Sequence, residues 1–146
     1  MIDGSFQTQY KIGLEGEELV LRYLKQKHSI EDVRLDKYFQ ERDIDFIVDG
    51  VSLEIKTDKN ISKTGNIYLE TRNDGWFNKC RAEYLGIYSP QTKTVYILKY
   101  DILKSLLPFG KEISHFDSDT YLETKATLIP LFVAEKNGAL TQKIKL

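Results

Sequence analysis

The sequence predicts an α/β fold that starts with a helix, continues through a run of short strands, and then adds a second helix and further strands. The first helix is indicated by apolar residues that recur at helical spacing between Leu14 and Leu24. The strands are indicated by alternating apolar and polar residues on both sides of Asp49-Gly50. The 146 residues suit a single domain built around one hydrophobic core.

The composition, with 41% hydrophobic and 29% charged residues, is typical of a globular protein. No stretch is long and apolar enough to span a membrane, and the first residues show no secretion signal, so we expect no membrane partner. Cys80 is the only cysteine, which excludes an internal disulfide and favours a reducing, cytoplasmic location. A secreted protein without disulfides stays open as the alternative.

The side chains available as ligands restrict the kind of metal site that the chain can build. Two histidines and one cysteine argue against a zinc site of the usual nitrogen and sulfur type. A metal ion should therefore be a hard cation held by oxygen atoms. The net charge is −1, so contacts with nucleic acid have to come from local clusters of basic residues.

The elements follow from local patterns along the chain. We expect the first helix over about Leu14 to Lys27 and a short strand over Val33 to Leu35. Two strands, Ile44 to Val48 and Val51 to Lys56, flank Asp49-Gly50, a pair typical of tight hairpins in which both central residues need positive φ.

A second group of elements follows a polar loop over Asp58 to Gly65. Asn73-Asp74-Gly75 predicts a turn that opens a helix from Trp76 to about Tyr84. Further strands are expected over Asn66 to Thr71, Leu85 to Tyr88, Thr94 to Lys99, Thr127 to Val133 and Leu140 to Ile144, the last two as a hairpin around Asn137-Gly138. The stretch from Gly110 to Thr124 has no clear pattern.

A two-residue hairpin loop fixes the register of the first two strands and places Asp45 opposite Glu54. One face then carries six apolar residues: Ile44, Phe46, Val48, Val51, Leu53 and Ile55. The other face carries Asp43, Asp45, Ile47, Ser52, Glu54 and Lys56. Two opposed carboxylates repel each other unless a cation lies between them, and Lys56 adds a compact positive charge beside them. The alternative is a solvated outer face of the sheet.

The first helix offers a third carboxylate to this site. On a helical wheel, Glu17 lies at the centre of the apolar stripe, whereas Glu18 lies at its edge. A carboxylate buried in an apolar stripe is costly unless it is paired or binds a metal ion. The alternative is a partly exposed Glu17 near the start of the helix, where the helix dipole favours a negative charge.

Asp45 followed by Glu54-Ile55-Lys56, with the helical Glu17 before them, resembles the PD-(D/E)xK nuclease superfamily. The spacing of Gly13 and Glu17, followed by Val20-Leu21, is similar to its Holliday junction resolvase branch. The segment Gly65 to Glu70, with Gly75-Trp76 and Lys79, is similar to phage members. The likeness covers about Gly13 to Asp58 and a strand–helix–strand continuation to Leu98, and the proline of the motif is Ile44 here.

The resemblance implies a restriction-endonuclease-like core, α-β-β-β-α-β, with a central mixed sheet flanked by helices and Mg²⁺-dependent hydrolysis of DNA phosphodiesters. Asp45 and Glu54, with the Ile55 carbonyl, would bind the ion, for which Mn²⁺ would substitute. Lys56 would orient or activate the attacking water, and Glu17 would hold this water or a second ion. We expect one domain over residues 1–146, with a core over about 13–105 and a C-terminal extension over about 106–146.

Basic residues near this site form a candidate DNA surface: Lys59, Lys63, Arg72, Lys79 and Arg81. The alternative for Lys59 and Lys63 is ordinary solvated charge, and Trp76 is interpreted as a core anchor rather than a base-stacking residue. Cutting both strands of DNA usually needs two active sites, so we expect a homodimer. A junction resolvase, a homing endonuclease and a restriction-like enzyme all fit the sequence. So do a catalytically inactive DNA-binding module with the same fold and an interaction protein with an incidental charged sheet face.

Overall fold

The computed structural model describes residues 4–72, 75–117 and 122–146. Its helices are α1 (Gly4–Lys25), α2 (Lys37–Gln40), α3 (Ile61–Thr64), α4 (Trp76–Lys79), α5 (Tyr100–Ser105) and α6 (Leu131–Lys136), with a 3₁₀ turn η1 (Leu107–Phe109). Its strands are β1 (Ile30–Asp32), β2 (Phe46–Val48), β3 (Val51–Thr57), β4 (Asn66–Glu70), β5 (Tyr84–Ser89), β6 (Thr94–Lys99), β7 (Lys111–Asp117), β8 (Leu122–Pro130) and β9 (Leu140–Lys145).

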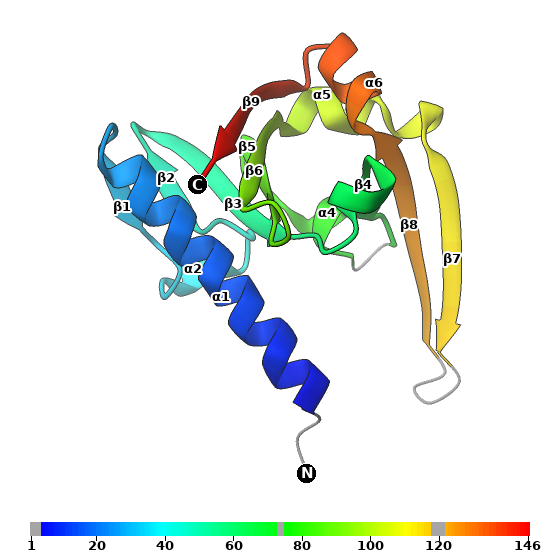
Figure 1. Ribbon diagram of the computed structural model, residues 1–146, viewed down its shortest axis with the longest axis horizontal. Coiled ribbons are helices and arrows are strands. Elements are labelled where there is room, and N and C mark those ends of the chain that lie inside the picture. The colour runs from blue at the N-terminus through cyan, green and yellow to red at the C-terminus, as the bar shows by residue number, and fades with distance from the viewer. Residues whose placement is uncertain (1–3, 73–74, 118–121) are drawn as a thin grey trace.

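The strands form two sheets. A six-stranded sheet has the order β1-β2-β3-β5-β6-β9, and a three-stranded sheet has the order β4-β8-β7 (Figure 1). In the larger sheet β3 and β5 run parallel, and the other neighbours run antiparallel. The predicted α/β class, a mixed central sheet flanked by helices, is confirmed.

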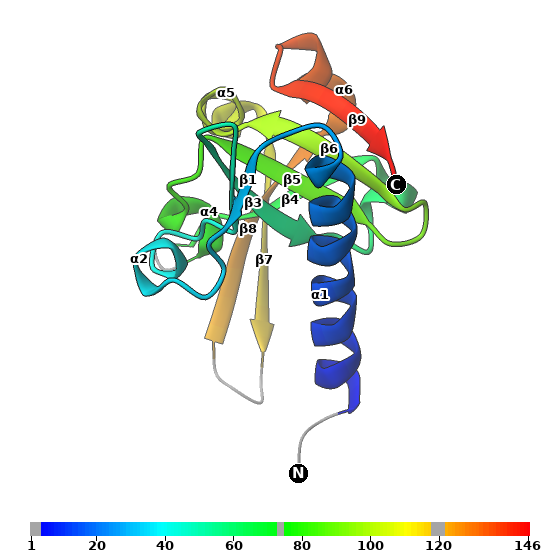
Figure 2. The same ribbon diagram turned by 90° about the vertical axis from the view of Figure 1, so that its left-hand side faces the viewer.

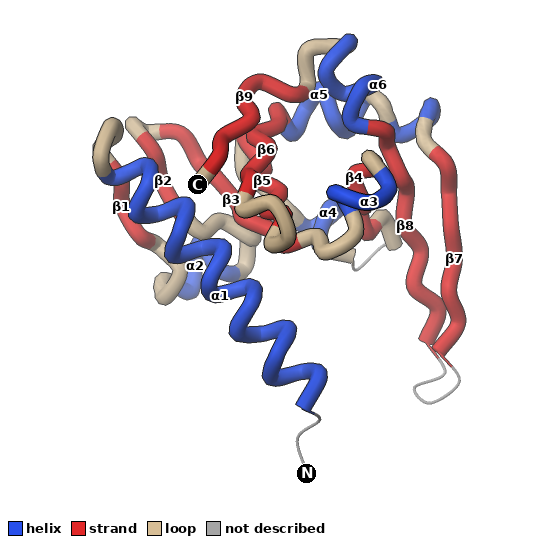
Figure 3. The backbone as a smooth tube through the Cα atoms, viewed as in Figure 1, coloured by secondary structure: helices blue, strands red, loops and turns tan. Residues whose placement is uncertain are grey.

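Two hydrophobic clusters cover the two faces of the larger sheet. On one face, Val20, Leu21 and Leu24 of α1 pack against residues that include Leu53 and Ile55 of β3. On the other face, the short helices and the smaller sheet supply most of the packing, with Phe77, Leu103, Ala134, Ile67 and Ile129 among the buried residues. Figure 3 shows this arrangement, with the long helix α1 on one side and the short helices α3, α4, α5 and α6 on the other. Residues that alternate along β3 therefore enter different layers of the molecule.

The first hairpin agrees with its local signals. Asp49 and Gly50 have φ of 49° and 83°, as a two-residue turn of this kind requires. Phe46 pairs with Leu53, Ile47 with Ser52 and Val48 with Val51, which is the predicted register. The turn therefore sets which side chains of β3 face α1.

Several boundaries differ from the prediction for reasons of tertiary pairing. The first helix begins at Gly4, and the first short strand is Ile30–Asp32 rather than Val33 to Leu35, because it pairs with β2 through Ile30 and Val48. The predicted loop over Asp58 to Gly65 contains the single turn α3. Of the predicted turn before α4, Asn73 and Asp74 lie outside the described residues.

The helix predicted from Trp76 to Tyr84 ends at Lys79. The backbone turns to an extended conformation at Cys80, and the Arg81 N–H then donates to the carbonyl of Arg42 at 2.9 Å. Tyr84 belongs to β5, where it pairs with Leu53 of β3. The helix therefore ends after one turn, because the following residues lead into β5, which pairs in parallel with β3.

The C-terminal part of the chain was predicted wrongly as a simple hairpin. Leu131–Lys136 is a helix, and the segments on either side of it enter different sheets. β8 pairs with both β7 and β4. The strand predicted over Asn66 to Thr71, which is β4, therefore joins the smaller sheet instead of the central one. β9 extends the larger sheet beside β6. Residues assigned to the extension therefore contribute to both sheets.

Two elements project from the body of the molecule toward the same side. These are the N-terminal half of α1 and the antiparallel ribbon of β7 and β8 (Figures 1 and 2). Leu14 and Tyr10 of α1 are 39% and 61% exposed, because this half of the helix lies beyond the sheet. None of the helices among the described residues is both long and apolar enough to cross a membrane.

Candidate active site

The candidate site lies where β2 ends and leaves part of the β3 edge unpaired. The Asp45 N–H donates to the Leu53 carbonyl at 3.0 Å, and the Asp45 carboxylate accepts the Ile55 N–H at 2.8 Å. The backbone and side chain of Asp45 thus bond to the residues on either side of Glu54. Because the N–H and C=O of one strand residue point to the same edge, the Ile55 carbonyl lies on the edge that Asp45 occupies.

A turn before Asp45 takes the chain out of the sheet. Asp43 has a φ of 51°, in the left-handed region, and the Ile44 N–H donates to the Phe39 carbonyl at 3.0 Å. Ile44 consequently packs in the layer of the short helices, while Ile55 packs under α1. The prediction that Ile44 shares an apolar face with Ile55, and that Asp43 pairs with Lys56, is wrong because the strand ends before it reaches them.

Glu54 and Lys56 point into the layer that contains α4. Glu54 is only 5% exposed, so this part of the predicted polar face is not a solvated surface. The Lys56 ammonium lies 3.4 Å from Glu54 Oε1 and 5.3 Å from the centre of the Trp76 ring. Burial, and after it the negative charge of Asp45, raises the pKa of Glu54 to about 9.

Asp45 is itself mostly buried, and burial is the main reason why its pKa is raised. The N–H of Ile55 and the charge of Lys56 act in the opposite direction, because they favour the carboxylate. Asp45 and Glu54 are therefore two coupled acids that share one nearby cation, Lys56. Positive charge at this position would stabilise both in their ionised form.

Glu17 approaches the same place from α1, on the opposite face of the sheet. Its side chain is 22% exposed against 48% for Glu18, so the predicted difference between the two neighbours is confirmed. Burial and the charge of Asp45 raise the pKa of Glu17 to about 7. A Cβ on Gly16 would lie 2.7 Å from Tyr88 Cδ2 and 3.2 Å from Thr57 Oγ1, so the glycine lets α1 approach the end of β3.

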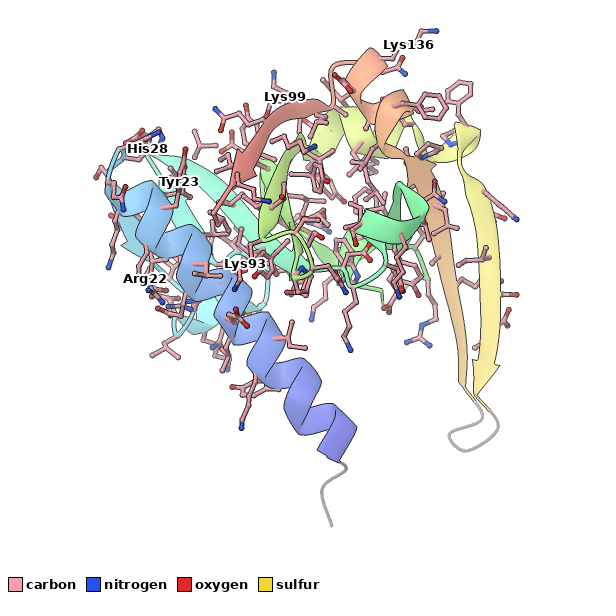
Figure 4. All side chains as sticks on the ribbon, in the orientation of Figure 1. Arg22, Tyr23, His28, Lys93, Lys99 and Lys136 are labelled. Carbon is pink, nitrogen blue, oxygen red and sulfur yellow. The ribbon has the colours of Figure 1, made fainter. Side chains whose placement is uncertain are left out.

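Two basic residues, Arg34 and Lys93, hold α1 beside the site through ion pairs. The Arg34 guanidinium lies 2.7 Å from Glu18 Oε1 and 3.6 Å from Glu17 Oε1, and it also binds both carboxylate oxygens of Asp32. Lys93, in the turn between β5 and β6, reaches Glu15 at 3.1 Å (Figure 4). Arg34 therefore links α1 to β1 and sets the surroundings of Glu17.

Sequence reasoning did not assign a role to Arg34 or Asp43. Arg34 belongs to no recognisable motif, and although it also binds the nearby Asp32, its contacts with Glu17 and Glu18 span 16 or more residues, so no local signal places it beside the site. Asp43 carries a buried Oδ2 atom without a hydrogen-bond partner among the described residues, and its charge raises the pKa of Glu54 and Asp45. The alternating pattern did place Asp43 near these acids, although a turn rather than a strand brings it there.

The donor set fits a hard divalent cation in its chemistry. Asp45, Glu54 and the Ile55 carbonyl offer oxygen atoms, which Mg²⁺ and Mn²⁺ prefer. The unpartnered oxygen of Asp43 and the raised pKa of Glu54 mark a local excess of negative charge that a cation would relieve. Among residues 4–72, 75–117 and 122–146, no three His, Cys, Asp or Glu side chains are already gathered around one point, so the acids would have to draw together around an ion.

The predicted DNA-contacting residues fall into two groups. Lys59, Lys63 and Lys79 are exposed, the first two around α3 and the third at the end of α4. Arg72 donates to the Glu123 carbonyl at 2.9 Å, and Arg81 donates to the carbonyls of Asn78, Lys79 and Cys80. The two arginines thus hold backbone segments together, while the lysines extend into solvent.

Comparison with known proteins adds a similarity in structure. No family model matches the sequence, and no curated protein is significantly similar to it. The chain is similar to a bacterial homing endonuclease, I-Ssp6803I, with 19% sequence identity and a TM-score of 0.48. The superposition covers 70% of this chain and 71% of the endonuclease.

Proposed function

We propose that the protein is a metal-dependent endonuclease that hydrolyses phosphodiester bonds in DNA. The observation that carries this proposal is Glu54, a carboxylate only 5% exposed that lies beside Asp45 and 3.4 Å from Lys56. Two acids in such a place reduce the stability of the ion-free fold, and strongly perturbed carboxylates of this kind cluster at functional sites. Their order along the chain is also that of the superfamily which the sequence resembles.

Each residue has a role that its position supports. Asp45, Glu54 and the Ile55 carbonyl would hold Mg²⁺, or Mn²⁺ in its place, and a bound ion of this kind supplies Lewis-acid polarisation of a phosphoryl oxygen. Lys56 presents its ammonium to the same place, where it orients a water molecule and balances the charge that develops on the phosphate. Glu17, with its pKa raised to about 7, is matched to accept a proton from this water near neutral pH.

The finer assignment concerns the DNA substrate and the assembly. The exposed lysines Lys59, Lys63 and Lys79 would contact phosphates around the site, and a homodimer would supply the second active site needed to cut both strands. The resemblance in sequence favours a Holliday junction resolvase, homing or restriction-like enzyme. A phage or mobile-element origin follows from the same resemblance.

A catalytically inactive DNA-binding module with a nuclease-like fold is the second candidate. Glu17 favours it, because its carboxylate lies 3.6 Å from the Arg34 guanidinium rather than being gathered with the other acids. This candidate predicts DNA binding that does not depend on Mg²⁺ and no strand cleavage under any condition.

The deciding experiment incubates the purified protein with junction, duplex, nicked and single-stranded DNA in Mg²⁺, Mn²⁺, Ca²⁺ or excess EDTA. We expect cleavage with Mg²⁺ or Mn²⁺, binding without cleavage in Ca²⁺, and no cleavage in EDTA. Asp45→Ala, Glu54→Ala and Lys56→Ala should each abolish cleavage, with Glu18→Gln as an active control. Full activity in EDTA, or in two of these three alanine variants, would exclude the proposed site.

A further inference from the structure

A cavity of about 610 Å³ opens beside Lys56, on the side of the larger sheet that faces β4. Its size lies in the range of about 300–1,000 Å³ that is usual for sites binding small organic groups. Lys56 and Trp76 form the wall nearest the candidate active site, and Lys56 also contacts Glu54. The cavity is therefore continuous with the place where the proposed reaction occurs.

The alternation of β4 supplies the aromatic wall of this cavity. Ile67 and Leu69 are fully buried in the core, so Asn66 and Tyr68 point to the opposite side, into the cavity. Tyr68 is 36% exposed and lies opposite Leu128 of β8, another cavity residue. A tyrosine ring beside a leucine offers a flat apolar surface of the kind on which a nucleobase stacks, and Trp76 lines the same cavity.

Two side-chain amides add hydrogen-bonding groups to the same space. Asn60 precedes α3 but its side chain does not cap the helix, and the Asn66 side chain makes no hydrogen bond with a described residue. Each amide combines a donor and an acceptor, which is the combination that the edges of the nucleobases present. Lys59 also lines the cavity and supplies positive charge near its entrance.

We propose that this cavity binds one nucleobase of the substrate strand, held outside the base stack next to the phosphate that Lys56 engages. This inference rests on the proposed function and specifies its substrate. A base stacked within a duplex cannot reach the walls of such a cavity, so it must be extruded or already unpaired, as at a bulge, a mismatch or in a single strand. Tyr68 would stack on the base, and Asn60 and Asn66 would bond to its edge.

The test measures binding in Ca²⁺ to three DNAs of the same sequence. One carries 2-aminopurine as a single bulged base, one carries it paired, and the third is the single strand. We expect the bulged duplex to bind about 10-fold or more tightly than the paired duplex, because an unpaired base has less pairing and stacking to lose. Quenching of the bulged 2-aminopurine by the protein would report stacking on Tyr68.

Three variants separate this site from general DNA binding. Tyr68→Ala should weaken binding of the bulged duplex about 5- to 150-fold, the range for one base–aromatic contact, and should remove the quenching. Tyr68→Phe should retain both. Phe132→Ala is the matched control, because Phe132 is a 70% exposed aromatic residue of α6 that does not line the cavity. An equal loss for the paired duplex indicates that the protein extrudes the base itself, and a loss confined to the bulged duplex indicates that it captures a base already unpaired.

The outcomes distinguish this inference from the proposed function. Cleavage by the wild type, together with identical binding by Tyr68→Ala and Phe132→Ala, would overturn the base-binding site alone. Binding that depends on Tyr68 without any cleavage would support the base-binding site and overturn the nuclease. A protein that neither binds nor cleaves any of the DNAs would overturn both.

Discussion

At the scale of single residues, the site is defined by acids that are poorly accommodated in the ion-free protein. Glu17 and Glu54 have ordinary pKa values of 4.5, which the fold raises to about 7 and about 9. Both groups therefore bind protons more tightly in the folded protein than in the unfolded chain between pH 4.5 and those raised values. Together they lower the free energy of unfolding, and this loss grows with pH while the groups ionise in the unfolded chain but stay protonated in the folded protein.

We predict that the free energy of unfolding in EDTA falls as pH rises from 4.5 through 7 toward 9, apart from other titrating groups. Glu54→Gln should remove most of this slope and should stabilise the ion-free protein at pH 8 by a few kcal/mol, because Glu54 otherwise has to take up on folding a proton that the unfolded chain has lost. Urea unfolding of the wild type and Glu54→Gln across this pH range measures the difference. A variant less stable than the wild type at pH 8 would show that the charge of Glu54 stabilises the fold.

Glu17 and Glu18 provide a matched pair for testing catalysis. Glu17→Gln should lower the cleavage rate about 100-fold or more, the usual contribution of a positioned proton acceptor. Glu18→Gln should change the rate little, because Glu18 is more exposed and contacts Arg34 alone among the described charged residues. Single-turnover cleavage rates and melting temperatures of both variants decide between a catalytic and a structural acid. An active Glu17→Gln enzyme would show that Glu17 is not a catalytic acid. An inactive Glu18→Gln enzyme would show that Glu18, rather than Glu17, serves the reaction.

At the scale of elements, the sequence predicted what local signals determine. The Asp49-Gly50 turn fixed the hairpin register, and the helical wheel distinguished Glu17 from Glu18, because both depend on neighbouring residues. The sheet that β4 joins depends on its pairing with β8, in which Ile67 lies opposite Ile129, about 60 residues later in the sequence. The length of α4 depended on the pairing of Tyr84 with Leu53. Contacts of this range leave no local pattern, and the same holds for the approach of Arg34 to Glu17.

The turn at Asp43 provides a test at this scale. Asp43→Asn should keep the fold, because asparagine tolerates the left-handed conformation that Asp43 adopts. Asp43→Val should destabilise the protein by about 1–3 kcal/mol and impair cleavage, since a β-branched residue is strained at positive φ. Melting temperature and cleavage rate of both variants separate the backbone effect from the loss of charge. Equal stability of the two variants would mean that the turn does not depend on its backbone conformation.

At the scale of the whole molecule, a chain with a net charge of −1 must place its basic residues locally if it binds DNA. The exposed lysines Lys59, Lys63 and Lys79 lie in or beside the short helices α3 and α4. A DNA strand bound at Lys56 would therefore lie close to these lysines, since Lys59 lines the same cavity as Lys56 and Trp76 of α4 lies beside Lys56.

We predict that Lys63→Ala and Lys79→Ala each weaken binding to all DNA sequences alike. Each lost phosphate contact should reduce the slope of log affinity against log salt by about 0.9 for duplex DNA. Lys136→Ala is the control, because Lys136 is an exposed lysine of α6 at the far end of the molecule from the N-terminus of α1 (Figure 4). Fluorescence anisotropy titrations at several salt concentrations measure the slopes. If only Lys136→Ala changes the slope, the DNA surface lies elsewhere.

The hydrogen bond between Ile44 and Phe39 also bears on how relatives of this chain are to be found. A proline at position 44, as in the superfamily's motif, has no N–H and would lose this bond. In this protein the backbone before Asp45 is fixed by the short helix α2 and by the left-handed conformation of Asp43, where a proline would restrict it otherwise. A sequence search that requires a proline before the aspartate would miss such chains. A better search pattern combines a residue tolerant of the left-handed conformation two positions before the aspartate with a helical turn just ahead of it.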